Sequence, residues 1–187
     1  MFNFSAGPAA LPLPVLQEAQ ENLVCYPGAG ASIMEISHRS KTYDKIHAQA
    51  QANIKQLLNL GDDYQVLFLQ GGASMQFTML AMNFLQGKSA DYILTGSWGS
   101  KAISEAKKHG QVNLAWSGKD ENYVRVPKNE ELKLSGDAQY VHSTSNETIQ
   151  GVEFPEAPEV GDKPLICDFS SSFLSGPIDA AKYAMIY

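Results

Sequence analysis

Two glycines and a hydroxyl follow an apolar run near the middle of the chain, and this pattern is suited to binding a phosphate. The run Val66–Leu69 precedes Gly71 and Gly72, and Ala73 and Ser74 then open a predicted helix. Glycines let the backbone turn sharply after a strand, and the N–H groups at the start of a helix attract an anion. The alternative is a plain strand-to-helix turn with Ser74 as the N-cap.

A carboxylate stands at the end of a second apolar run. Asp168 directly follows Leu165–Cys167. At the carboxyl end of a strand such a carboxylate can hold the other end of a phosphate-bearing cofactor, or it can serve as the N-cap of a following helix. Together with the glycine turn, Asp168 predicts a cofactor that carries a phosphate.

Composition and charge narrow the classes of partner. The net charge is −6, and no cluster of basic residues exceeds Lys107–Lys108, so a nucleic-acid surface is not expected and the substrate should be small. Cys25 and Cys167 lack metal-ligand spacing and are expected to be reduced, packed thiols. The N-terminus has no basic region followed by an apolar core, and no segment is apolar over the roughly 20 residues that cross a bilayer. We therefore expect a cytoplasmic protein without a membrane partner.

The elements that must position these residues follow from periodicity and turn residues. Helical spacing predicts helices over 41–60, 74–85 and 101–108, and apolar runs predict strands over 65–70, 92–95, 112–115, 138–142, 164–168 and 183–187. The segment 154–162 is predicted to be a loop. This alternation favours an α/β fold, a mainly parallel sheet with helices on both faces and a site outside the strands' carboxyl ends. A Rossmann dinucleotide domain shares that class, but Gly28–Ile33 lacks its third glycine and a convincing preceding strand.

Several short blocks along the chain carry a family resemblance. They are similar in order and spacing to the phosphoserine aminotransferases, of the fold-type-I, class V pyridoxal-phosphate aminotransferase family: Phe4–Pro8, Glu35–Ser40, Gly71–Phe77, Gly96–Trp98, Ser145–Gly151 and Asp168–Ser171. The resemblance implies an N-terminal arm over 1–15 and a partial large PLP-binding domain over 16–187. It also implies a transaminase of serine biosynthesis that exchanges an amino group between glutamate and 3-phosphohydroxypyruvate, giving 2-oxoglutarate and O-phosphoserine.

The resemblance implies a cofactor, pyridoxal 5′-phosphate, and the residues that bind it. Ala73 and Ser74 would bind the phosphate, Trp98 would stack on the ring, Thr148 would hydrogen-bond the phenolic oxygen, and Asp168 would pair with the pyridine nitrogen. Taken alone, Trp98 could simply be packed in the core, and Thr148 also completes an Asn-Glu-Thr glycosylation sequon.

Substrate binding is implied for one basic pair. The resemblance implies that His38 and Arg39 bind substrate anions, with the neighbouring subunit of a homodimer contributing to the site. Arginine suits bidentate recognition of a carboxylate. The alternative is a surface arginine near a helix start, beside a histidine whose hydrogen bonds are satisfied.

No lysine of this chain matches the catalytic position of the family. The family's Schiff-base lysine lies in a Gly-x-Gln-Lys stretch after the strand that Ala184–Tyr187 resembles, so it is expected beyond Tyr187. The resemblance thus implies the N-terminal half of the enzyme, truncated before that lysine and inactive alone. The alternative is a noncatalytic module that binds PLP or another phosphorylated ligand.

Overall fold

The structure is a computed structural model that describes residues 2–5, 7 and 9–187. Within the block Phe4–Pro8, Ala6 and Pro8 lie outside the described residues. The chain forms two compact units, one ending at Leu67 and the other running from Phe68 to Tyr187. The predicted division into an arm over 1–15 and a domain over 16–187 stays a prediction.

The first unit is built from helices whose starts are capped locally. It contains α1 (Leu13–Val24), the 3-10 helix η1 (Ile33–Glu35) and α2 (Lys41–Leu57). Ser40 caps α2, because its hydroxyl accepts the Tyr43 N–H at 3.1 Å. Ser32 and Glu35 form a capping box at η1. The helix predicted over 41–60 is confirmed, with its last regular residue at Leu57.

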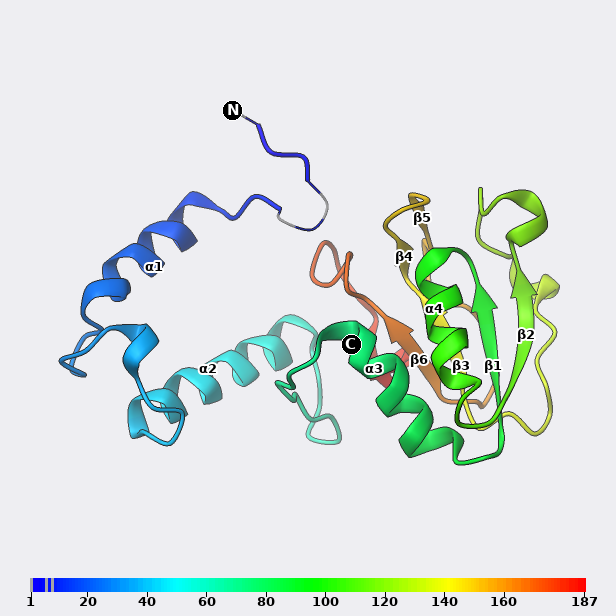
Figure 1. The fold of residues 1–187 in the computed structure, drawn as a ribbon, viewed down its shortest axis with the longest axis horizontal. Helices are drawn as coiled ribbons and strands as arrows, with labels where there is room; N and C mark the ends of the chain where they lie inside the picture. Colours follow the sequence, from blue (N-terminus) through cyan, green and yellow to red (C-terminus); the bar gives the residue numbers. More distant parts are fainter. Residues whose placement is uncertain (1, 6, 8) are drawn as a thin grey trace. The chain divides into compact units, whose positions relative to one another are not determined.

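The second unit is organised around a five-stranded sheet with the order β2-β1-β3-β6-β7. Every pair of neighbours in it is parallel. Its strands are β1 (Ser89–Leu94), β2 (Gln111–Ser117), β3 (Val141–Thr144), β6 (Leu165–Asp168) and β7 (Met185–Ile186). The predicted parallel α/β sheet is confirmed, and Figure 1 shows how its strands are arranged. The bounds of each strand overlap those of a predicted one.

Two helices cover one face of this sheet (Figure 1). They are α3 (Gly72–Leu80), which continues into a π-helical turn over Ala81–Leu85, and α4 (Ser97–Ala106). Their apolar residues share one buried cluster with the strands, which includes Phe77, Leu80, Leu85, Ala102, Ile103, Tyr92, Tyr140 and Ile166. On the opposite face, buried residues such as Val141 and Cys167 pack against loop residues, including Phe154 and Ile178.

Short elements complete the second unit. An antiparallel hairpin joins β4 (Asn146–Glu147) to β5 (Val152–Glu153), directly after the carboxyl end of β3. The 3-10 helices are η3 (Lys119–Glu121), η4 (Asn129–Glu131) and η5 (Ala180–Lys182). The segment 154–162 is a loop, as predicted. In the described part of the chain no helix combines the length and apolar character needed to cross a membrane.

One predicted strand is wrong. Residues 65–70 adopt no strand, and no strand among the described residues pairs with them. Leu67 and Leu69 keep 66% and 57% of their surface exposed. An apolar run becomes a strand only where a neighbouring strand takes up its backbone hydrogen bonds, and a sequence pattern does not reveal that neighbour.

Candidate functional site

Asp168 lies at the carboxyl end of β6, as the apolar run before it predicted. It is in register with Thr144, the last residue of β3, and only 4% of its surface is exposed. Asp168 Oδ1 accepts the Ser170 N–H at 2.9 Å and the Ser170 hydroxyl at 2.6 Å. Among the described residues no hydrogen bond reaches Oδ2. The carboxylate is therefore held through one oxygen and can accept a ligand hydrogen bond with the other.

The N-terminus of α3 has no side-chain cap. Its N-cap residue is Gly71, which has φ +106°, and Gly72 follows with φ +61°. A Cβ added to Gly71 would lie 2.6 Å from the Met75 Cβ, so both the dihedral angle and the packing require glycine there. Ser74 is exposed inside the first turn, so its interpretation as an N-cap is wrong. The backbone N–H groups around Ala73 remain oriented for an anion.

The N-terminus of α4 also follows a glycine turn, but a carboxylate already binds it. Glu147 is completely buried, and its Oε2 and Oε1 accept the N–H groups of Trp98 and Gly99, each at 2.8 Å. Gln150 Oε1 accepts the Ser97 N–H at 3.2 Å. Because these donors are already paired, of the two helix starts only α3 is free to bind a phosphate.

Sequence reasoning missed the role of Glu147. Glu147 is 49 positions from Trp98 along the chain, and no helical or strand periodicity links the two. Burial raises the pKa of Glu147 above its usual range, and the charge of Asp168 also raises it. The hydrogen bonds from the backbone of Gly99 and Trp98 and from the Thr95 side chain oppose the shift.

Besides His142 Nδ1, two buried polar atoms of α4 and β3 lack a hydrogen-bond partner among the described residues. They are Trp98 Nε1 and Thr144 Oγ1. A buried donor or acceptor without a partner costs free energy, so such atoms mark places where a ligand or water can be bound. Thr144 ends β3 and is in register with Asp168, so its hydroxyl lies at the same carboxyl end of the sheet.

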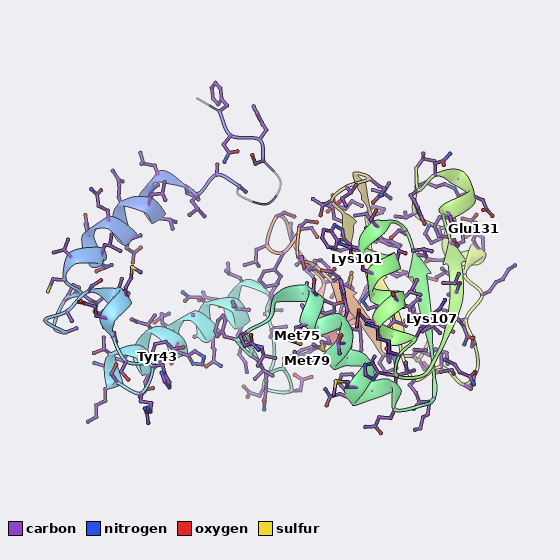
Figure 2. All side chains as sticks on the ribbon, in the orientation of Figure 1. Tyr43, Met75, Met79, Lys101, Lys107 and Glu131 are labelled. Atoms are coloured by element: carbon purple, nitrogen blue, oxygen red, sulfur yellow. The ribbon has the colours of Figure 1, made fainter. Side chains whose placement is uncertain are left out.

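The Trp98 side chain is half-buried and contacts a cation. The Lys101 Nζ lies 4.1 Å from the centroid of the Trp98 ring. Both residues belong to α4, on which Lys101 is labelled in Figure 2. Thr148 is also half-buried, in the turn that follows β4. The residue between Asn146 and Thr148 is Glu147, which binds the backbone of Trp98. The structure therefore links these two predicted cofactor residues through one intervening side chain.

His142 is a buried histidine in β3, two residues before Thr144. His142 Nε2 is 2.7 Å from the Tyr187 hydroxyl oxygen, and the His142 ring stacks on Tyr92 with centroids 4.7 Å apart. Phe77 of α3 contacts the His142 and Tyr187 rings edge-on. Burial lowers the pKa of His142 to about 3, so this ring is neutral at physiological pH.

The predicted substrate residues belong to the other unit. His38 and Arg39 directly precede Ser40, the cap of α2, and both are exposed. The Arg39 N–H donates to the Ser37 hydroxyl at 3.2 Å. Their role in binding substrate stays a prediction.

A cleft of about 470 Å³ lies elsewhere in the second unit. Its lining comes from the segments after β5 and β6 and includes Phe154, Glu156, Ser172, Asp179, Lys182 and Tyr183. Neither Asp168 nor Trp98 lines it. Among the described residues no group of three or more histidine, cysteine, aspartate or glutamate side chains could hold a metal ion.

Known proteins resemble the chain over its whole length. A phosphoserine aminotransferase of Pseudomonas fluorescens (strain SBW25) is 53% identical over 187 residues, which are 100% of this chain and 52% of the relative. One of Rhodopirellula baltica is 50% identical over 190 residues, 100% of this chain and 50% of the relative. The chain thus spans about half the length of the curated relatives it matches.

Solved structures agree with this fold. The phosphoserine aminotransferase from Bacillus circulans subsp. alkalophilus superposes with a TM-score of 0.94 at 50% identity, covering 98% of this chain and 51% of that one. A PLP-bound phosphoserine aminotransferase from Trichomonas vaginalis gives a TM-score of 0.90 at 40% identity, over 99% and 52% of the two chains.

The model of the family Aminotransferase class-V matches residues 1–187. Because this model matches and relatives are about 50% identical over the entire chain, the protein belongs to the class-V aminotransferase family.

Proposed function

We propose that this chain is the PLP-binding half of a phosphoserine aminotransferase, which exchanges an amino group between glutamate and 3-phosphohydroxypyruvate. The observation that carries the proposal is that the second unit has both an α3 N-terminus without a side-chain cap and a buried Asp168. The Oδ2 of Asp168 accepts no hydrogen bond from the described residues. The relatives are phosphoserine aminotransferases, which supports phosphoserine and its oxo acid as one substrate pair. Serine biosynthesis, a cytoplasmic location and a homodimer are part of the same proposal.

The residues present fit pyridoxal 5′-phosphate at both of its ends. Backbone N–H groups at Ala73 and Ser74, with the Ser74 hydroxyl, would hold the phosphate, because the left-handed glycine turn leaves them uncapped. Asp168 Oδ2 would hold the pyridine nitrogen in its protonated form. Trp98 would stack on the ring, and Thr148 would hydrogen-bond the phenolic oxygen.

Bound pyridoxal phosphate supplies an electron-accepting ring and a carbonyl carbon that carries the amino group between substrates. This chain contributes orientation and charge. Asp168 would place a negative charge at the pyridine nitrogen, and its burial, with 4% of its surface exposed, would limit screening of that charge by water. His38 and Arg39 would bind the carboxylate or phosphate of the substrate. The proton-transferring lysine is expected beyond Tyr187.

Borohydride reduction followed by intact-mass measurement tests the proposal. The sample should be the full family-length protein, meaning a polypeptide that carries this chain and the portion that the relatives have beyond it. We expect a pyridoxyl-lysine adduct beyond Tyr187 and exchange of amino groups between glutamate and 3-phosphohydroxypyruvate. An adduct within residues 1–187, or tight PLP binding without amino transfer, would instead support a noncatalytic phosphoryl-ligand module.

A further inference from the structure

The first turn of α4 is held by side chains from a distant hairpin. Glu147 accepts two backbone hydrogen bonds, from Trp98 and Gly99, with one carboxylate oxygen each. Gln150 adds a reciprocal pair with Ser97, because its Oε1 accepts the Ser97 N–H and its Nε2 donates to the Ser97 hydroxyl at 2.8 Å. Helix starts usually take a cap from the residue that precedes them. Here Gly96 precedes α4, and that residue has no side chain to offer.

The packing around Gly96 and Gly99 fits this arrangement. A Cβ added to Gly96 would lie 2.6 Å from both the Glu147 Cδ and the Gln150 Oε1. A Cβ added to Gly99 would lie 3.1 Å from the Glu147 Oε1. The glycines therefore admit the carboxylate to the backbone, and Glu147 fills the space that side chains would otherwise occupy.

The hairpin that carries Glu147 also carries a predicted cofactor residue. Glu147 is the last residue of β4, and Thr148 follows it in the turn. The Gly151 N–H donates to the Glu147 carbonyl oxygen at 2.8 Å, which closes this turn. Across the hairpin, the Phe154 N–H donates to the Ser145 carbonyl oxygen at 2.8 Å. Backbone hydrogen bonds therefore close the turn at its base, and its connection to α4 runs through Glu147 and Gln150.

We propose that Glu147 is a positioning residue that joins Trp98 and Thr148 into one unit, so that the ring-stacking and phenolic-oxygen contacts of the cofactor are set together. Buried carboxylates are costly unless both oxygens are hydrogen-bonded, and here both are. Both Glu147 carboxylate oxygens accept backbone N–H groups, so Glu147 needs no direct contact with substrate or cofactor. It acts through the backbone of Trp98, whose side chain then takes a fixed direction from α4. The inference rests on the proposed function where it assigns the cofactor contacts.

Fluorine NMR of 5-fluorotryptophan-labelled protein tests the positioning itself. The chain has two tryptophans, Trp98 and Trp116. In the full family-length protein, Trp98→Phe and Trp116→Phe assign their resonances. We expect Glu147→Gln to shift or broaden the Trp98 resonance and to leave Trp116 unchanged, because one carboxylate oxygen becomes an amide donor that faces a backbone donor. The matched control is Glu153→Gln, which removes the same charge from an exposed position of the same hairpin.

Amide hydrogen exchange gives a second readout that does not depend on the cofactor. First-turn N–H groups of a helix exchange rapidly unless a cap protects them. We expect slow exchange at Trp98 and Gly99 in the parent protein, at least about tenfold faster exchange in Glu147→Gln, and no change in Glu153→Gln. Should Glu147→Gln fail to fold, Gln150→Leu is used, and exchange should then accelerate at Ser97. Unchanged resonances and unchanged exchange would overturn the inference.

A double-mutant cycle tests the link to the cofactor. We expect Glu147→Gln to raise the Kd for pyridoxal phosphate about tenfold in the parent protein and to have little further effect in a Trp98→Phe background. Additive effects of the two substitutions would show that Glu147 does not act through Trp98. If the parent protein binds no pyridoxal phosphate, the proposed function fails, whereas the resonance and exchange readouts still decide whether Glu147 positions Trp98.

Discussion

Thr144 and Asp168 end two neighbouring parallel strands in register, so a buried hydroxyl and a buried carboxylate stand side by side at one edge of the sheet. The Thr144 hydroxyl lacks a partner among the described residues, and Asp168 uses only Oδ1 for the hydrogen bonds from Ser170. Parallel sheets place ligand sites outside their carboxyl ends, which is where these unused groups lie.

Asp168→Asn should retain the fold and lose most of the amino-transfer activity. The amide oxygen can still accept the hydrogen bonds from Ser170, but the negative charge at the pyridine nitrogen is gone. We expect turnover in the full family-length protein to fall by about 10- to 100-fold, the value of a hydrogen bond to a charged group. Steady-state kinetics and thermal unfolding measure the two effects. Near-normal turnover would remove Asp168 from the cofactor site.

Arg39→Ala should weaken substrate binding and leave the absorption spectrum of the bound cofactor unchanged. Loss of a bidentate hydrogen bond to a carboxylate or phosphate predicts a KM about 10- to 100-fold higher. Arg125 is the matched control, because it is the other arginine of the chain and binds Glu121 and Glu131 instead. Loss of bound cofactor in Arg39→Ala would show that the role is misassigned.

Gly71→Ala should destabilise the protein more than Gly87→Ala. Both glycines have a positive φ, +106° for Gly71 and +81° for Gly87, but only at Gly71 would a Cβ meet another atom, the Met75 Cβ at 2.6 Å. Overpacking of this kind costs about 1–3 kcal/mol beyond the shared backbone strain. Urea unfolding of the two variants measures the difference. Equal losses would mean that the turn before α3 relaxes freely.

His142 should make stability fall as the solution becomes acidic. Burial lowers its pKa to about 3 from the ordinary value of 6.5, so the unfolded chain binds a proton that the folded state excludes. Stability from this group is therefore complete above pH 6.5 and is lost as pH falls toward 3, at up to about 1.4 kcal/mol per pH unit. His142→Phe should flatten the slope in urea unfolding between pH 4 and 6.5, relative to the exposed control His38→Asn. A parallel slope in parent and variant would contradict the assignment.

The sequence was sufficient for those parts of the fold that depend on local patterns. Periodicity predicted α2 and the parallel strands, since a half-buried helix and a buried strand each impose their own spacing of apolar residues. The same reasoning failed at 65–70, because strand formation there depends on a partner strand. The helix start at Gly72 was also missed, since the left-handed Gly71 allows the helix to begin two residues earlier than the predicted start at Ser74.

The candidate site was less accessible to sequence reasoning. The family resemblance named Asp168, Trp98 and Thr148, but no local pattern connects Glu147 with the first turn of α4 across 49 positions. Both α3 and α4 begin after a glycine, and a sequence does not show which of the two N-termini is capped by a distant side chain. The unpartnered Thr144 hydroxyl likewise appears only when tertiary packing buries it.

A crystal structure of the full family-length protein with pyridoxal phosphate bound would test the central claim most directly. We expect phosphate oxygens about 2.7–3.2 Å from the backbone nitrogens of Ala73 and Ser74, and Asp168 Oδ2 at a similar distance from the pyridine nitrogen. Glu147 should remain bound to Trp98 and Gly99. A phosphate at the start of α4, with Glu147 displaced, or a cofactor held in the cleft beside Lys182, would contradict the account.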